Sequence, residues 1–170
     1  MSEMKNICRN SAEKNGMTIL ELVVVMAFFL ILSGTITVNL AGLQQQSNLN
    51  TSLNTLINDI RSQQLKAQTG ETQGAAAGDD YGVYFTATGY ILFKGSSYNP
   101  ADPQNFAINL GSNLTFSNIS LPQSQVVFLR GSGEVSGFNQ NSDSVTLANT
   151  LNSENKTVTL NMYGVITGVN

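Results

Sequence analysis

Residues 16–32 read GMTILELVVVMAFFLIL, and every residue from Leu22 to Leu32 is apolar. The apolar character continues, diluted by serine, glycine and threonine, as far as Leu43. As an α-helix, residues 22–43 would extend about 33 Å, which matches a hydrocarbon core of about 30 Å. No charged residue occurs between Glu21 and Asp59. The pattern predicts a transmembrane helix.

Glu21 is the one charged residue at the start of this apolar run. A carboxylate inside a bilayer costs about 2.5–3.5 kcal/mol at the centre of a helix and less near its end. A secretory signal peptide and a plain signal anchor both account for a basic start followed by an apolar middle. Neither accounts for the carboxylate, which needs a partner in apolar surroundings.

The motif Gly16-Met17-Thr18-Ile19-Leu20-Glu21-Leu22 resembles the processing signal of type IV prepilins and type II secretion pseudopilins. The resemblance implies that residues 1–16 are a leader and that a prepilin peptidase and methyltransferase cleaves between Gly16 and Met17 and N-methylates Met17. It also implies that Glu21 acts in assembly. The motif departs from the family in having Met17 where Phe is usual, and in the order Ile19-Leu20. Cleavage would remove Cys8, the only cysteine.

A pairing between the new N-terminus and Glu21 is physically reasonable. Residues four apart lie on one face of a helix, so the amine of Met17 can neutralise Glu21 of the same subunit or of a neighbouring one. Such a pair removes most of the cost of a carboxylate in apolar surroundings. In the family that the motif resembles, this pair is thought to set the axial register of assembly.

The helical pattern continues beyond the apolar run. Leucine and isoleucine recur at steps of three and four residues from Leu49 to Ile60, with polar residues between them, which is typical of an amphipathic helix packed on a sheet. Gly70 follows as a stop signal. The sequence predicts one helix from Met17 to about Thr69.

Beyond Gly70 the apolar residues recur every second position, as in β-strands. Short predicted strands alternate there with glycine-rich turns. The clearest predicted strands are 81–86, 90–94, 126–130, 145–148 and 157–162. The segments 126–133 and 156–166 resemble the globular domain of H-type minor pseudopilins of type II secretion and of FimT-like minor pilins. We therefore expect an α+β, pilin-like fold: a long N-terminal helix, transmembrane in its first half, packed on a C-terminal antiparallel β-sheet or small sandwich.

Four regions follow from this prediction. They are a cleaved leader (1–16), the transmembrane or filament-core half of the helix (17–43), its amphipathic half (44–69), and a β-rich globular domain (70–170).

The composition excludes several classes of enzyme. The chain of 170 residues has no His and one Cys, so a Ser-His-Asp or Cys-His nucleophile and a His-bearing zinc site are excluded. Asp79-Asp80 is the one adjacent pair of carboxylates, in a predicted loop, and we interpret it as solvated rather than as a calcium site. We predict no catalytic activity, no cofactor and no metal site.

Other motifs have plain structural explanations. The Gly131-Ser132-Gly133 turn is not a phosphate-binding loop, because no helix with Lys-Ser/Thr follows it. Four Asn-x-Ser/Thr triplets are expected by chance in so Asn-rich a chain. Tyrosines in strands more often pack in a core than form a binding surface. The triplets begin at Asn50, Asn113, Asn118 and Asn155, and the tyrosines are Tyr81, Tyr84, Tyr90 and Tyr98.

The predicted function is that of a non-catalytic structural subunit, a minor pilin or pseudopilin of a type IV pilus or type II secretion pseudopilus. Its expected partners are the prepilin peptidase, other pilin or pseudopilin subunits, and inner-membrane lipid before assembly. Its expected location is the bacterial inner (cytoplasmic) membrane, single-pass with the globular domain outside the cytoplasm, and then the pilus or pseudopilus.

Three alternatives remain open: a major fibre-forming pilin, a minor pilin of DNA uptake, and a membrane-anchored binding module. Nucleic-acid binding is disfavoured, because Lys156 is the only basic residue among the last forty and contact with phosphate requires Lys or Arg.

Overall fold

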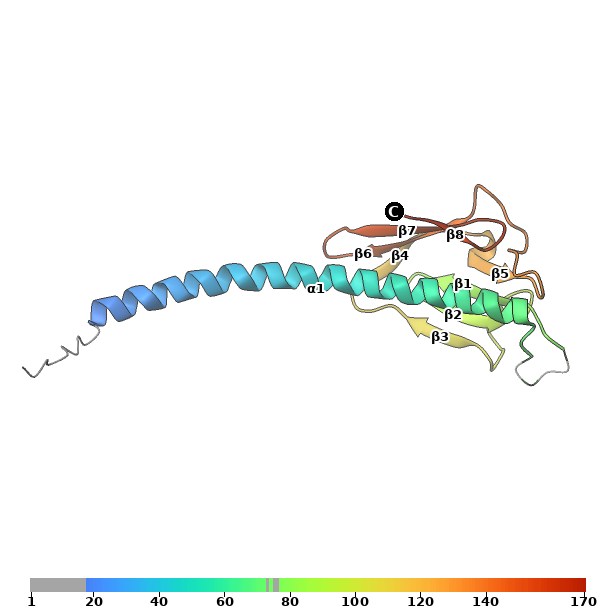
Figure 1. Cartoon of the computed structure of the whole chain (residues 1–170), viewed down its shortest axis with the longest axis horizontal. Helices are drawn as coiled ribbons and strands as arrows, with labels where there is room; N and C mark the ends of the chain where they lie inside the picture. Colours follow the sequence, from blue (N-terminus) through green and yellow to red (C-terminus); the bar gives the residue numbers. More distant parts are fainter. Residues whose placement is uncertain (1–17, 73, 75–76) are drawn as a thin grey trace, which may run out of the picture. The chain divides into compact units, whose positions relative to one another are not determined.

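A computed structural model describes residues 18–72, 74 and 77–170, without the side chains of helical residues 34–47. The chain divides into two compact units, one ending at Leu40 and one running from Ala41 to Asn170. Figure 1 shows the helix α1 and, in the second unit, the strands that surround its C-terminal part.

Helix α1 (Ile19–Thr69) ends in a well-defined cap. Gly70 adopts a left-handed conformation (φ 63°). Its N–H donates to the carbonyl of Ala67 (3.2 Å), and the N–H of Glu71 donates to the carbonyl of Lys66 (3.0 Å). This pair of bonds is the Schellman motif, which satisfies carbonyls that the end of a helix leaves unpaired. The predicted stop at Gly70 is therefore correct.

The predicted membrane span is wrong. Among the residues that the structure describes, no helix is both long and apolar enough to cross a bilayer. The strongly apolar part of α1 with described side chains is 19–33, about 22 Å of helix, whereas a span needs about 20 apolar residues. From Asn48 to Thr69 polar residues interrupt the apolar ones. The expected fold with a long apolar, transmembrane half-helix is corrected accordingly, and so is the expected single-pass location in the inner membrane.

Among the residues that the structure describes, the strands form two antiparallel sheets of four, the second of the two arrangements expected, a sheet or a small sandwich. The first sheet has the order β3-β2-β1-β5, and the second has the order β4-β6-β7-β8. A 3-10 turn, η1 (Pro122–Ser124), connects β4 to β5. The strands are β1 (Tyr81–Thr86), β2 (Gly89–Lys94), β3 (Phe106–Asn109), β4 (Leu114–Ser120), β5 (Gln125–Phe128), β6 (Ser144–Asn149), β7 (Asn155–Leu160) and β8 (Ile166–Val169).

In the first sheet, β1 and β2 form a hairpin whose register pairs Thr86 with Gly89. A Cβ on Gly89 would lie 2.4 Å from the carbonyl oxygen of Ile108 on β3, so only glycine allows this close approach. The other edge of β1 pairs with β5, which lies about forty residues later in the chain. Such a pairing brings residues from distant parts of the sequence into one sheet.

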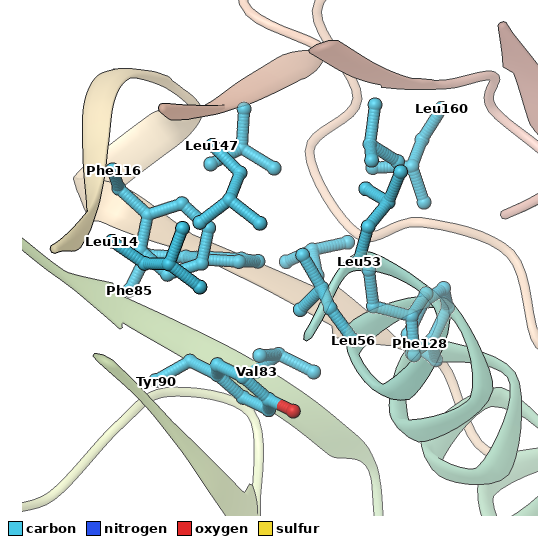
Figure 2. Close-up of a cluster of buried hydrophobic side chains, with 14 of the residues drawn as sticks. Leu53, Leu56, Val83, Phe85, Tyr90, Leu114, Phe116, Phe128, Leu147 and Leu160 are labelled. Carbon is cyan, nitrogen blue, oxygen red and sulfur yellow. The ribbon is translucent and has the colours of Figure 1, made fainter. Parts of the chain in front are cut away.

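One hydrophobic core joins α1 and both sheets. Leu53 and Leu56 on α1 face Val83 and Phe85 of the first sheet and Leu147 and other residues of the second (Figure 2). In β6 buried and partly buried residues alternate, as expected for a strand with one face in the core. The amphipathic pattern of residues 49–60 therefore predicted the buried face of the helix correctly.

Candidate assembly segment

The first turn of α1 is fixed by Thr18. The backbone N–H of Glu21 donates to Thr18 Oγ1 (3.2 Å), and the N–H of Leu22 donates to the Thr18 carbonyl (3.1 Å). Thr18 is thus the N-cap, and Glu21 is the third residue of the helix. A Ser/Thr-x-x-Glu sequence in these positions matches the signature of a capping box, of which Thr18 makes the first bond, from its Oγ1 to the N–H of Glu21. The same carboxylate lies in the first turn, where the helix dipole favours negative charge.

The residues on either side of Glu21 expose apolar side chains all around the helix. Consecutive helical residues point about 100° apart, so a run of four or five covers the whole circumference. Ile19 is 83% exposed, and even Val25, the least exposed of the group, is 37% exposed. The large exposed apolar residues are Ile19, Leu20, Leu22, Val23, Val24, Val25, Met26, Phe28, Phe29, Leu30, Ile31 and Leu32. Glu21 is itself exposed and is the only charged residue among them.

The other two predicted site residues are Gly16 and Met17, between which cleavage is predicted. Both lie outside the residues that the structure describes. The described neighbour of the predicted cleavage point is Thr18, the helix cap. Cleavage at that point would leave a new amine one residue before the cap. The structure thus places Glu21 in the first turn of a helix whose N-cap adjoins the predicted new N-terminus.

Asp79 and Asp80 have local structural contacts. Asp80 Oδ1 accepts the backbone N–H of Arg130 (2.7 Å), and Arg130 Nη1 donates to the Gly78 carbonyl (2.8 Å). Asp79 Oδ1 accepts the N–H of Asp80 (2.9 Å). Within the part of the chain that the structure describes, no group of three or more His, Cys, Asp or Glu residues could hold a metal ion. Asp80 and Arg130 thus fix the loop before β1 to the turn after β5, whereas the bond of Asp79 stays within the loop.

The Gly131-Ser132-Gly133 turn packs against the end of α1. The N–H of Gly131 donates to the Ala67 carbonyl (2.9 Å), and Gln64 Nε2 donates to the Gly133 carbonyl (2.9 Å). Gly133 has φ 70°, and a Cβ there would lie 2.4 Å from the side chain of Gln68. The turn is a structural contact for the helix and not a phosphate-binding loop.

The four tyrosines that the sequence analysis considered contribute mainly to the packing of the fold. Tyr81 and Tyr90 are buried, and Tyr84 stacks on Tyr98 with ring centroids 4.2 Å apart. The Tyr90 hydroxyl donates to Asp59 Oδ2 on α1 (2.6 Å). Burial raises the pKa of Tyr90 well above its usual value, and the hydrogen bond to Asp59 raises it further. This bond ties β2 to the helix beside the core.

We expect Tyr90→Phe to lower the free energy of unfolding by about 1–3 kcal/mol, because Asp59 loses the donor to its partly buried carboxylate. The raised pKa means that folded Tyr90 stays neutral while the unfolded chain ionises above pH 10.0. Its stabilising contribution is therefore fully present below that pH and is lost as the pH rises. Denaturant unfolding between pH 7 and 11 should show that the free energy of unfolding falls less steeply with rising pH in the variant than in the wild type.

The matched control for this prediction is Tyr163→Phe, which changes a tyrosine that is 57% exposed. It should change the free energy of unfolding by less than about 0.5 kcal/mol. If the free energy of unfolding fell equally with rising pH in the wild type and in Tyr90→Phe, the raised pKa would not belong to Tyr90.

Sequence reasoning missed two functional features of α1. The N-cap at Thr18 was visible in the sequence as Thr18-x-x-Glu21, but the motif was interpreted only as a processing signal. Gln64 and Gln68 reach three backbone carbonyls of distant turns, of Gly133, Tyr163 and Ser132. No sequence signal could have shown these contacts, because a surface glutamine in a helix looks the same whether or not it has a distant partner.

No protein-family model, curated protein or solved structure matches this chain at a significant level. These comparisons therefore show no family membership. The resemblance of residues 16–22 to a prepilin processing signal remains a prediction.

Proposed function

We propose that this protein is a non-catalytic structural subunit of a filament, a minor pilin or pseudopilin, which assembles through the N-terminal part of α1. The observation that supports the proposal is the exposed apolar surface of Ile19–Leu32 with the single carboxylate of Glu21 at its start. The subunit's task is packing, and no chemical step is required of it. Its expected partners are copies of itself or related subunits.

The exposed apolar surface is a strong driving force for assembly. Full burial of a large apolar side chain contributes about 1.5–3 kcal/mol. Burial of six of the twelve exposed side chains would therefore contribute about 9–18 kcal/mol, comparable with the roughly 4–15 kcal/mol that association costs. Apolar helices that bundle side by side satisfy their backbone polar groups internally. A bundle of such segments is thus a stable filament core.

Glu21 would then determine the register of the bundle. A carboxylate carried into an apolar core is strongly unfavourable unless a cation and hydrogen-bond donors meet it. The predicted amine of Met17 in a neighbouring subunit is such a cation. Axial positions that leave Glu21 unpaired are disfavoured, which selects one stagger between neighbours.

The test is mass spectrometry of the N-terminus from native cells, on the sheared surface fraction and on the cell-associated fraction. We expect a chain that begins at N-methylated Met17. A small amount in the sheared fraction supports a minor subunit, whereas a large amount there would assign the chain to a major, fibre-forming pilin. A chain that keeps residues before Met17, in cells with an active prepilin peptidase, would overturn the proposal.

A further inference from the structure

An open pocket lies on the outer face of the first sheet. Its volume is about 380 Å³, within the range of about 300–1,000 Å³ that is typical of ligand pockets. Val127 of β5 contributes to its wall. The strand neighbours of Val127 are Val126 and Phe128, which belong to the hydrophobic core, so Val127 points to the opposite face of the sheet. The pocket shares no residue with the predicted assembly segment.

The pocket is polar but uncharged. Among the described residues that line it, none is acidic or basic. Its polar side chains are the amides of Gln123 and Gln125 and the hydroxyls of three serines, and Pro122 and Val127 add apolar surface. An ion that leaves water for such a site meets no opposite charge in return. The lining therefore favours a neutral ligand that forms hydrogen bonds.

The polar groups converge on the amide nitrogen of Gln125. Gln125 Nε2 lies 3.4 Å from Gln123 Oε1 and 3.5 Å from Ser97 Oγ. Both distances are longer than the usual 2.9–3.0 Å or so of an N–H···O bond, so both bonds are weak. Gln123 and Ser97 are exposed residues. A nitrogen donor with two loosely held oxygen partners thus borders the open pocket.

The orientation of the Gln125 amide is fixed from behind. Its Oε1 accepts the backbone N–H of Tyr98 (3.0 Å). The ring of Tyr98 stacks on Tyr84 with centroids 4.2 Å apart and lies edge-on to Phe93 at 5.8 Å. These contacts hold the segment after β2, and with it Ser97, against the sheet. A site that is ordered before binding loses less entropy when a ligand binds.

The turn that carries Gln123 is strained. Gln123 (φ 53°) and Ser124 (φ 56°) both adopt the left-handed conformation. In this conformation a Cβ atom crowds the following carbonyl, so glycine is the residue that adopts it without strain. Burial does not explain a glutamine at this position, because Gln123 is exposed. Strained backbone of this kind is concentrated at ligand-binding and other functional sites.

From these observations we infer that the pocket binds one sugar unit of an uncharged glycan. A hydroxyl both donates and accepts, so one sugar hydroxyl can accept from Gln125 Nε2 and donate to Gln123 Oε1, which lie 3.4 Å apart. A second hydroxyl can bond to Ser97 Oγ. The C–H groups of the sugar ring then lie against the apolar surface of Pro122. The inference goes beyond the proposed assembly and does not depend on it.

A peptide fits this place less well. An extended peptide gains most of its affinity by adding a strand to a free sheet edge. One edge of β5 pairs with β1, and the other edge is already occupied. The N–H of Ser136 donates there to the Val127 carbonyl (2.8 Å). The N–H of Leu129, just after β5, donates to the Glu134 carbonyl (2.9 Å).

The test is an NMR titration of the full-length chain with the methyl glycosides of glucose, galactose, mannose and N-acetylglucosamine. A polyoxyethylene detergent keeps the chain dissolved and, unlike a maltoside, carries no sugar. The side-chain amide signal of Gln125 is the direct readout. We expect at least one glycoside to shift it saturably, with a dissociation constant of about 10 mM or tighter. The amide of Gln63, which is 3% exposed, should not shift. Absence of a saturable Gln125 shift with all four glycosides would overturn the inference.

Gln123→Gly separates ligand binding from a structural role. It should weaken binding of the glycoside about tenfold, because the ligand loses a hydrogen bond. The free energy of unfolding should stay the same or rise, because glycine adopts φ 53° without strain. Ser153→Gly is the matched control: it relieves the same strain at φ 59° in the exposed turn between β6 and β7, and should leave binding unchanged. Unchanged binding in Gln123→Gly, or equal weakening in both variants, would overturn the site.

Two further probes test the chemical class of the ligand. Methyl glucuronide replaces the hydroxymethyl group of methyl glucoside by a carboxylate, and it should bind no more tightly than the glucoside, because no cation lines the described pocket. The neutral peptide acetyl-Ser-Gly-Ser-amide offers hydroxyls and backbone amides without a sugar ring, and it should bind more weakly than the best glycoside. Tighter binding of the acid than of the glucoside, or of the peptide than of every glycoside, would overturn the assignment to a neutral sugar.

Discussion

Glu21→Gln is expected to reduce incorporation into filaments by more than tenfold, while the globular part of the chain keeps its stability. Glutamine at the third helical position still serves in a capping box, so the helix start is preserved and only the charge is lost. If Glu21 sets the register by pairing with an amine, the neutral side chain cannot do so. Quantification of the subunit in sheared filaments, relative to its total amount, measures the effect.

Two companion variants complete this test. Thr18→Ala removes the side chain that caps α1, at a cost of about 0.5–2 kcal/mol to the helix, but leaves the carboxylate in place. It should assemble much more efficiently than Glu21→Gln or Glu21→Ala. Gly16→Ala should block processing instead, so that the leader remains. Normal incorporation of Glu21→Gln, together with loss of assembly in Thr18→Ala, would show that Glu21 acts only in the cap.

Leu56→Ala is expected to lower the free energy of unfolding by about 2–5 kcal/mol. Leu56 is fully buried at the point where α1 meets both sheets (Figure 2). Its truncation removes apolar contacts and leaves a cavity that the surrounding strands cannot fill without moving. For a chain of this size the midpoint of thermal unfolding should fall by roughly 5–15 °C. Calorimetry or circular dichroism would measure the change.

Leu65→Ala is the matched control on the same helix. Leu65 is 59% exposed, and its replacement should change the free energy of unfolding by less than about 0.5 kcal/mol. If Leu56→Ala and Leu65→Ala lowered the free energy of unfolding by similar amounts, the assignment of the buried face of α1 would be contradicted.

Local features of the fold were predictable from the sequence. The strand predicted at 81–86 is β1, and the helix ends where Gly70 predicted it. The strand predicted at 126–130 is β5, which ends at Phe128, and Phe128 makes an isolated bridge to Val135. The sequence left a single sheet and a small sandwich open, and the order of the strands was not predictable, because β1 pairs with β5 across a long stretch of chain.

The membrane prediction failed for a physical reason. It extended the span from the fully apolar run to Leu43, through a stretch that serine, glycine and threonine dilute. In the candidate assembly segment, Glu21 and its apolar neighbours could be selected from sequence, because charge and hydropathy alone distinguish them.

The contacts of Gln64 have a consequence for the order in which the chain can fold during synthesis. Its amide binds carbonyls that lie 69 and 99 residues further along the chain. At about 5–20 residues per second, ribosomes need roughly 5–20 s to make the second partner after Gln64. During that interval the apolar face of α1 has been made but its partners Leu147 and Leu160 have not. A newly made chain therefore needs protection from aggregation until its last strands emerge.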